Sequence, residues 1–121
     1  MLLVTSNKAR QLLHVGYVGH VRQEELRHNQ VDLATQLGEL SPGFRLLADF
    51  SRLDAMDLDC APELGRMMDL IGEAGVKTVV RIIPDRGKDI GLNILTVFHY
   101  RHRPRVVTCQ SLAEALKVLA L

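Results

Sequence analysis

The chain has no tryptophan, only two tyrosines and only three phenylalanines among its 121 residues. Proteins that bind single-stranded nucleic acid stack the bases on aromatic side chains, and this sequence offers few such platforms. The formal net charge of +1 gives no electrostatic reason to expect a nucleic acid or an anionic membrane as a partner. We therefore expect no nucleic-acid partner.

Cysteine and long apolar runs are also scarce. Cys60 and Cys109 are the only two cysteines, and one pair does not make the disulfide framework of a small secreted domain. No stretch is long and apolar enough to span a bilayer, and the first residues lack the apolar segment and cleavage site of a signal peptide. The sequence therefore predicts a cytoplasmic protein with reduced thiols and no membrane span.

The length and the order of the predicted elements indicate one α/β domain over residues 1–121. Apolar runs predict strands, and amphipathic periodicity predicts helices. The strands fall at 12–18, 44–50, 76–83 and 105–109, and the helices at 22–39, 62–74, 89–100 and 112–119. This alternation predicts a mixed, mostly parallel sheet of four to five strands, the fifth at the N-terminus, with about four helices.

Ligands and partners of such sheets usually meet the loops at the carboxyl ends of the strands. Here those loops are predicted at 51–61 and 84–89. The helix after the first loop carries an apolar stripe at i, i+3, i+4 and i+7, made by Leu64, Met67, Met68 and Ile71. The last helix begins with Ser111 and Glu114 at the spacing of a capping box.

The run LLADFSRLDAMDLDCAPELGRMMDLI resembles the central segment of the STAS (anti-sigma factor antagonist-like) domain family. Asp49-Phe50-Ser51 matches the end of the family's apolar strand, and Asp57 matches its later aspartate. Leu58 and Asp59 fall where relatives carry a serine pair, and Cys60 falls where they carry a glycine. The terminal SLAEALKVL also fits. A looser likeness links the chain to STAS-like bacterial proteins related to the CRAL-TRIO lipid-binding fold.

The resemblance implies a phosphorylation switch on a serine in relatives, but Asp59 has no hydroxyl group and cannot be that acceptor. Asp59 either imitates a permanently modified serine or caps the helix that follows, and we favour the cap. Asp57 faces the same two interpretations. Cys60 is either a thiol of lowered pKa near a helix N-terminus or a small buried residue, and we favour the second.

The first hypothesis is a non-enzymatic regulatory module of STAS type that binds a protein partner, such as an anti-sigma-type regulator. Its contact surface would be the loop 51–61 and the following helix. The residues assigned to it are Ser51, Asp57, Leu58, Asp59, Cys60, Glu63 and Met67. We assign no catalytic residue, because no nucleophile is paired with a base.

The second hypothesis is a carrier or sensor of a small apolar or lipid-like ligand. The aliphatic composition and the likeness to lipid-binding relatives favour it, with a pocket expected near Met68, Ile94 and Phe98. We expect no cofactor and no metal: His99 and His102 are three residues apart, but the usual zinc-binding spacings are missing.

Charge is distributed unevenly along the chain. Residues 76–121 hold eight Lys or Arg against three acids, whereas residues 1–75 hold seven against eleven. The basic run 99–105 is the densest part of this pattern, and we interpret it as a solvated helix end whose cations complement the helix dipole. Opposed charges also orient a partner or a second copy of the chain, so a homodimer is a further hypothesis.

Overall fold

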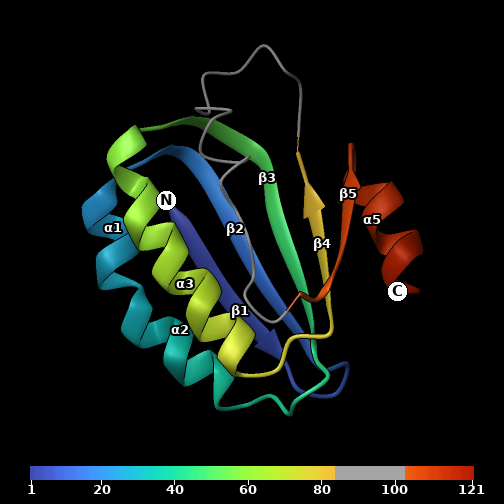
Figure 1. Ribbon diagram of the computed structural model, residues 1–121. Helices are drawn as coiled ribbons and strands as arrows, with labels where there is room; N and C mark the ends of the chain where they lie inside the picture. The colour runs from blue at the N-terminus through green and yellow to red at the C-terminus, as the bar shows by residue number, and fades with distance from the viewer. Residues whose placement is uncertain (84–102) are drawn as a thin grey trace.

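The computed structural model describes residues 1–83 and 103–121, and there it shows a five-stranded sheet in the order β1-β2-β3-β4-β5. β1 runs antiparallel to β2, whereas all other neighbouring strands pair in parallel (Figure 1). The strands span Leu2–Asn7, Leu12–Val21, Arg45–Met56, Thr78–Ile82 and Arg105–Cys109. The predicted α/β fold is confirmed, and β1 is the fifth, N-terminal strand.

The helices lie on both faces of this sheet. Helices α1 (Gln23–His28), α2 (Gln30–Leu37) and α3 (Ala61–Glu73) cover one face, and α5 (Leu112–Leu119) covers the other (Figure 1). The short 3-10 helix η1 (Leu58–Cys60) leads into α3. The helix predicted at 89–100 lies outside the described residues. Within the described part of the chain, no helix has the length and apolar character needed to cross a bilayer.

The single helix predicted at 22–39 is wrong, because the chain forms two helices that meet at Asn29. The Asn29 side-chain Nδ2 donates a hydrogen bond to the carbonyl oxygen of Glu25 at 2.8 Å. Asparagine competes with the helical ladder through such local side-chain bonds, which makes it a common residue at helix boundaries. The break leaves Leu26 on α1 and Leu33 on α2 both fully buried against the sheet.

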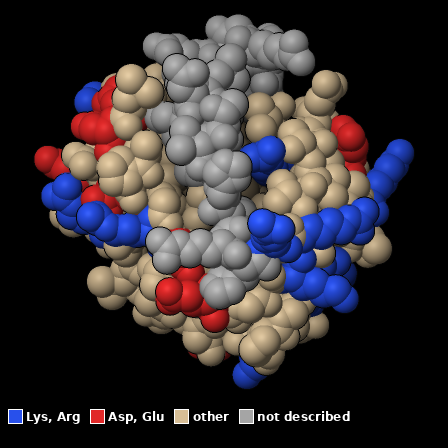
Figure 2. Space-filling view, viewed as in Figure 1, with Lys and Arg blue, Asp and Glu red and all other residues tan. Residues whose placement is uncertain are grey.

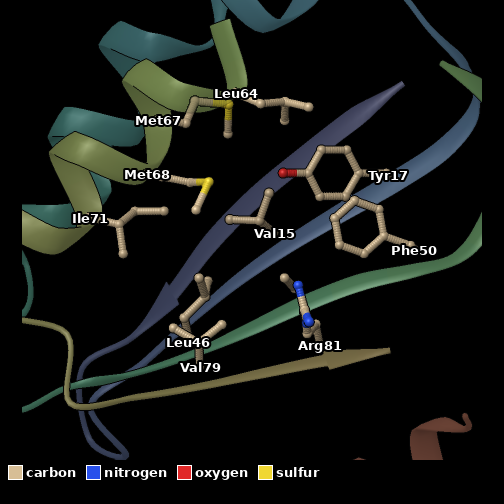
Figure 3. A pocket seen from close by; sticks show the side chains of 11 residues that line it. Val15, Tyr17, Leu46, Phe50, Leu64, Met67, Met68, Ile71, Val79 and Arg81 are labelled. Carbon is tan, nitrogen blue, oxygen red and sulfur yellow. The ribbon is translucent and has the colours of Figure 1, made fainter. Parts of the chain in front are cut away.

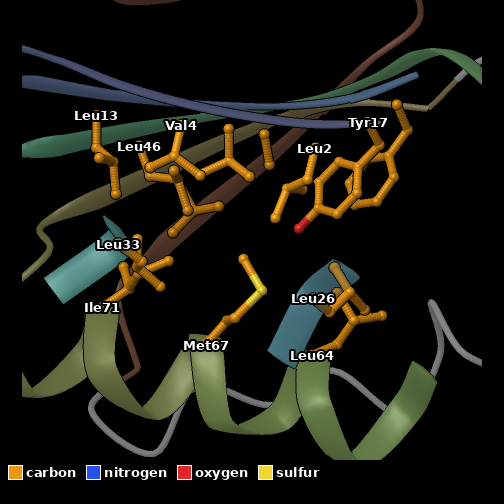
Figure 4. Packing of buried hydrophobic residues seen from close by; sticks show 14 of the residues in the cluster. Leu2, Val4, Leu13, Tyr17, Leu26, Leu33, Leu46, Leu64, Met67 and Ile71 are labelled. Carbon is orange, nitrogen blue, oxygen red and sulfur yellow. The ribbon is translucent and has the colours of Figure 1, made fainter. Parts of the chain in front are cut away.

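The larger hydrophobic core fills the space between the sheet and helices α1, α2 and α3 (Figure 4). Met67 of α3 points into this core in the close-up, with Leu33 and Leu26 on either side. Each buried aliphatic side chain of this size stabilises the fold by roughly 1.5–3 kcal/mol. The predicted apolar stripe of α3 therefore faces the sheet along its whole length, since all four of its residues are buried.

A smaller core lies on the opposite face, where α5 packs on β3, β4 and β5. Ala115 and Leu119 of α5 are buried against Leu47, Val80 and their neighbours. The helix begins at Ser111, whose Oγ accepts a hydrogen bond from the backbone N–H of Glu114 at 3.1 Å.

In a capping box the glutamate side chain also accepts a hydrogen bond from the backbone N–H of the N-cap serine, and here that second bond has a different donor. The Glu114 carboxylate accepts from the N–H of Gln110 at 3.1 Å rather than from that of Ser111. At the other end of α5, the Arg45 guanidinium donates to the carbonyl oxygen of Leu119. A cation is favoured at a helix C-terminus, so Arg45 of β3 holds α5 against the sheet.

Candidate functional site

The candidate site lies at the carboxyl ends of β2 and β3, and β3 reaches further than the sequence indicated. The predicted loop 51–61 is wrong in its first half, because β3 continues through Ser51 to Met56, which pairs with Val21 of β2. Ser51 is thus a half-buried strand residue and not part of an exposed loop. The strand continues because Leu53 and Met56 bury their side chains in the core while polar residues between them face outward.

Two irregularities bend this end of the sheet. The register of β2 against β3 shifts between Gly16 and Val18 and again between Gly19 and His20, as expected for the two glycines. The Asp49 carboxylate accepts a hydrogen bond from the backbone N–H of Ser51 at 2.8 Å. Bulges re-aim strand ends and are common beside functional sites.

The residues after β3 form an exposed acidic and apolar projection, which we name the Leu58 rim (residues 57–59). Leu58 is 67% exposed, and Asp57 and Asp59 on either side are exposed too. Asp57 Oδ1 lies 3.1 Å from Nε2 of His20 at the end of β2. The stretch around Asp59 starts η1 at the edge of the sheet, as predicted.

Asp57 occupies the N-cap position of η1 and Asp59 lies in its first turn, and the interpretation of the two as helix caps stays a prediction. Neither Asp57 before η1 nor Cys60 before α3 makes a side-chain cap hydrogen bond. The Asp57 carboxylate lies against His20 instead. The Asp59 side chain is exposed to solvent.

Cys60 is a small buried residue, as the favoured interpretation held. Its Sγ donates to the carbonyl oxygen of Val21 at 3.6 Å, and its side chain is fully buried. Burial, with the nearby Asp59 carboxylate, raises the pKa of the Cys60 thiol to about 11. The thiol is therefore protonated at neutral pH, and its assignment to an exposed contact surface is wrong because no part of it reaches solvent.

Glu63 was assigned to the contact surface, but its side chain is only 2% exposed. Its carboxylate accepts hydrogen bonds from Gln30 Nε2 at 2.7 Å and Arg66 Nη1 at 2.6 Å, and it lies 3.5 Å from Arg27 Nε. Burial of the carboxyl group raises its pKa, but Arg66 and then Arg27 outweigh this and hold the pKa of Glu63 below its usual value. Glu63 thus joins α3 to α1 and α2 from inside.

Met67 is likewise buried, at 2% exposure, and its placement on a partner-binding surface is wrong. The residue belongs to the stripe of α3 that faces the sheet. Of the seven residues assigned to that surface, the structure leaves the three of the Leu58 rim exposed. Ser51 is half-buried, and Cys60, Glu63 and Met67 belong to the interior.

A cavity of about 40 Å³ lies between α3 and the sheet. Figure 3 shows the side chains around it: Leu64, Met67, Met68 and Ile71 come from α3, and Tyr17, Phe50 and Val79 come from the strands beneath. Arg81 of β4 contributes the charged group among the lining residues. Met68 lies where the pocket was predicted, whereas Ile94 and Phe98 lie outside the described residues.

The rings of Tyr17 and Phe50 form one wall of this cavity. Their centroids are 4.3 Å apart and their planes differ by 5°, so the two rings are stacked. Both residues are in the stretch where β2 and β3 shift register. The sequence carried no signal for this contact, because the two residues lie on different strands.

Charge is unevenly distributed on the face seen in Figure 2. Blue Lys and Arg atoms gather on the right of the view, the side of β4, β5 and α5 in Figure 1, and outnumber the red atoms there, whereas red and blue are more evenly mixed on the left. Of the basic run predicted to dominate this pattern, residues 99–102 lie outside the described part of the chain. Arg103 and Arg105 are described and are exposed.

No model of a known protein family matches the sequence, and no curated protein matches it either. Solved structures do match. SpoIIAA, an anti-sigma factor antagonist, matches in its unphosphorylated form with a TM-score of 0.62 and 18% identity, over 99% of this chain and 98% of that chain. The Bacillus cell fate determinant SpoIIAA in its phosphorylated form gives a TM-score of 0.60 and 18% identity, over 98% and 99%.

A third match is an uncharacterised protein of the DUF3478 family from Shewanella loihica PV-4, which has a SpoIIAA-like fold. The TM-score is 0.67 at 20% identity, over 98% of this chain and 92% of that chain. The chain therefore has the SpoIIAA-like (STAS) fold over nearly its whole length. The resemblance inferred from the stretch around Asp49 and Asp57 is confirmed for the fold.

Proposed function

We propose that this chain is a non-enzymatic regulatory module of STAS type that binds a protein partner through the Leu58 rim. The observation that carries the proposal is Leu58 itself, a large apolar side chain that is 67% exposed at the carboxyl edge of the sheet. Carboxyl edges of parallel sheets are the usual binding edges of such folds. SpoIIAA, which shares the fold, is an anti-sigma factor antagonist. The partner class proposed here is accordingly an anti-sigma-type regulator.

The way the rim is anchored supports this proposal. Below Leu58, the Cys60 thiol bonds to the backbone of Val21, and beside it Asp57 contacts His20. Both contacts tie the rim to β2, so Leu58 projects from a fixed base. A preorganised anchor loses less conformational entropy on binding than a loop that must first be ordered.

The charges around Leu58 indicate the chemistry of the partner. Asp57 and Asp59 flank the leucine, and both are exposed. An apolar side chain between two carboxylates fits an apolar recess bordered by Lys or Arg. Asp59 has a carboxyl group where STAS relatives carry a serine, so we propose that binding does not depend on phosphorylation within 57–61.

The test places a photo-crosslinking amino acid at position 58 in cells that normally make the protein. Val31 on α2 is the matched control site, because it is 77% exposed and lies away from the rim. We expect a partner adduct from position 58 and none from position 31. With the crosslinker at position 59 instead, we expect an adduct from the chain with Leu58 and none from the Leu58→Asp variant.

Mass spectrometry of the adduct identifies the partner. An adduct between two copies of this chain would make the rim a homodimer contact. Equal adducts from positions 58 and 31, or none from position 58, would contradict the proposal. Phosphate found within residues 57–61 after expression in the same cells would contradict its phosphorylation-independent form.

A second candidate function, carriage of a small apolar ligand, is favoured by the cavity under α3. Its lining side chains are almost entirely aliphatic, aromatic or thioether groups (Figure 3). Methionine side chains adapt to irregular apolar ligands, and Met67 and Met68 both line this cavity. Native mass spectrometry of the purified protein should then show a co-purifying small molecule that dissociates on unfolding. A bare chain mass in every preparation would contradict carriage.

A further inference from the structure

Arg81 is out of place in its strand. β4 is a central strand, and Val79, Val80 and Ile82 around Arg81 are all buried. Central strands of parallel sheets are covered on both faces and are usually continuous apolar runs. A charged residue interrupts this apolar pattern. Such interruptions are expected at functional sites, so the groups around the Arg81 guanidinium matter.

The Arg81 side chain borders the cavity under α3, on the same face of the sheet as Val79 (Figure 3). Its Nε donates a hydrogen bond to Thr108 Oγ1 on β5 at 3.0 Å, which fixes the orientation of the guanidinium plane. Among the described residues, no carboxylate forms an ion pair with Arg81. A fixed cation thus lies beside a small apolar space.

We propose that the cavity and Arg81 together bind a small monocarboxylate with an apolar tail, in which the guanidinium receives the carboxylate and the Met67 and Met68 side of the cavity receives the tail. This inference rests on the carrier function proposed above and specifies its ligand. One guanidinium group balances one negative charge, and its planar N–H pairs match a carboxylate in geometry. The cavity of about 40 Å³ has room for only a few carbon atoms, so the tail must be short.

The experiment titrates the full chain with butanoate, butan-1-ol and butyl phosphate, followed by amide chemical shifts in ¹H–¹⁵N NMR spectra. We expect butanoate to bind at least about tenfold more tightly than butan-1-ol, with shifts at Tyr17, Met68 and Arg81. Arg81→Gln should weaken butanoate binding about 10- to 100-fold, because a hydrogen bond to a charged group is lost, and should leave butan-1-ol binding unchanged.

Arg52→Gln is the matched control, since Arg52 is an exposed arginine of β3 that does not line the cavity. It should leave all affinities unchanged. Arg81→Lys keeps the charge but loses the forked N–H donors, and it should bind butanoate with intermediate affinity. Thermal unfolding of each variant without ligand establishes that it is folded.

The possible outcomes separate this inference from the carrier function. If butan-1-ol and butanoate bind equally and Arg81→Gln changes neither, the carrier function stands and the carboxylate inference is overturned. If no probe binds, both are overturned. Tighter binding of butyl phosphate than of butanoate overturns the assignment to a carboxylate.

Discussion

Replacing Gly75 with alanine is expected to lower the free energy of unfolding by roughly 2–4 kcal/mol. Gly75 follows the end of α3 with a backbone φ of +95°, a conformation that L-amino acids rarely adopt. A Cβ atom there would lie 2.9 Å from Cβ and 3.0 Å from Cα of Pro42. The substitution therefore combines backbone strain with a steric clash against a rigid ring and its backbone.

Gly43 offers a matched control for the strain alone. Its φ is +96°, but among the described residues no heavy atom lies within 4 Å of the Cβ it would gain. Gly43→Ala is therefore expected to cost roughly 1–2 kcal/mol. Gly65→Ala has the opposite expected sign, because Gly65 is helical with open space around it, and it should gain roughly 0.5–1 kcal/mol.

Urea unfolding of the three variants and the parent measures these differences. The N–H of Gly43 donates to the carbonyl oxygen of Gly75 at 2.8 Å, which ties the end of α3 to the turn before β3. Equal losses for Gly75→Ala and Gly43→Ala would show that Pro42 moves away at no cost, and the steric half of the explanation would then be wrong.

Much of the fold could be predicted because it depends on local patterns. The apolar stripe of α3 and the serine that caps α5 each act within a few residues, and the structure has both. The alternation of strands and helices then leaves few topologies with right-handed crossovers. The SpoIIAA-like arrangement follows that order.

The errors came from contacts between distant residues. Ser51 and the residues after it contain serine and aspartate, which favour turns, yet pairing with β2 keeps them in a strand as far as Met56. Glu63 would be an exposed helix residue by composition, but Gln30, 33 positions earlier, meets its carboxylate in the interior. The residue pattern of α3 alone cannot predict a contact with a residue of another helix.

Arg81 shows the converse case, in which a local irregularity held a signal. An arginine within the β-branched run VKTVVRII contradicts the pattern of a buried strand. No role could be predicted for Arg81 from the sequence, because the role of a charged residue in a strand depends on which groups surround it in the fold. The structure supplies those neighbours, Thr108 and the apolar cavity.

Met67→Ala is expected to lower the free energy of unfolding by roughly 2–5 kcal/mol, since it removes most of a buried side chain between α3 and the sheet. Met67→Leu, which nearly conserves volume, should cost less than about 1.5 kcal/mol. Leu58→Asp changes an exposed residue and should stay within about 0.5 kcal/mol of the parent. Urea unfolding of the three variants checks this order.

The same variants separate stability from partner binding. Met67 is 2% exposed, so a folded Met67→Leu protein presents an unchanged Leu58 rim and should form the parental adduct from position 58. Leu58→Asp should show the reverse, with parental stability and no adduct when the crosslinker is at position 59. A Met67→Leu protein that is as stable as the parent but forms no adduct from position 58 would contradict the assignment of partner binding to the Leu58 rim alone.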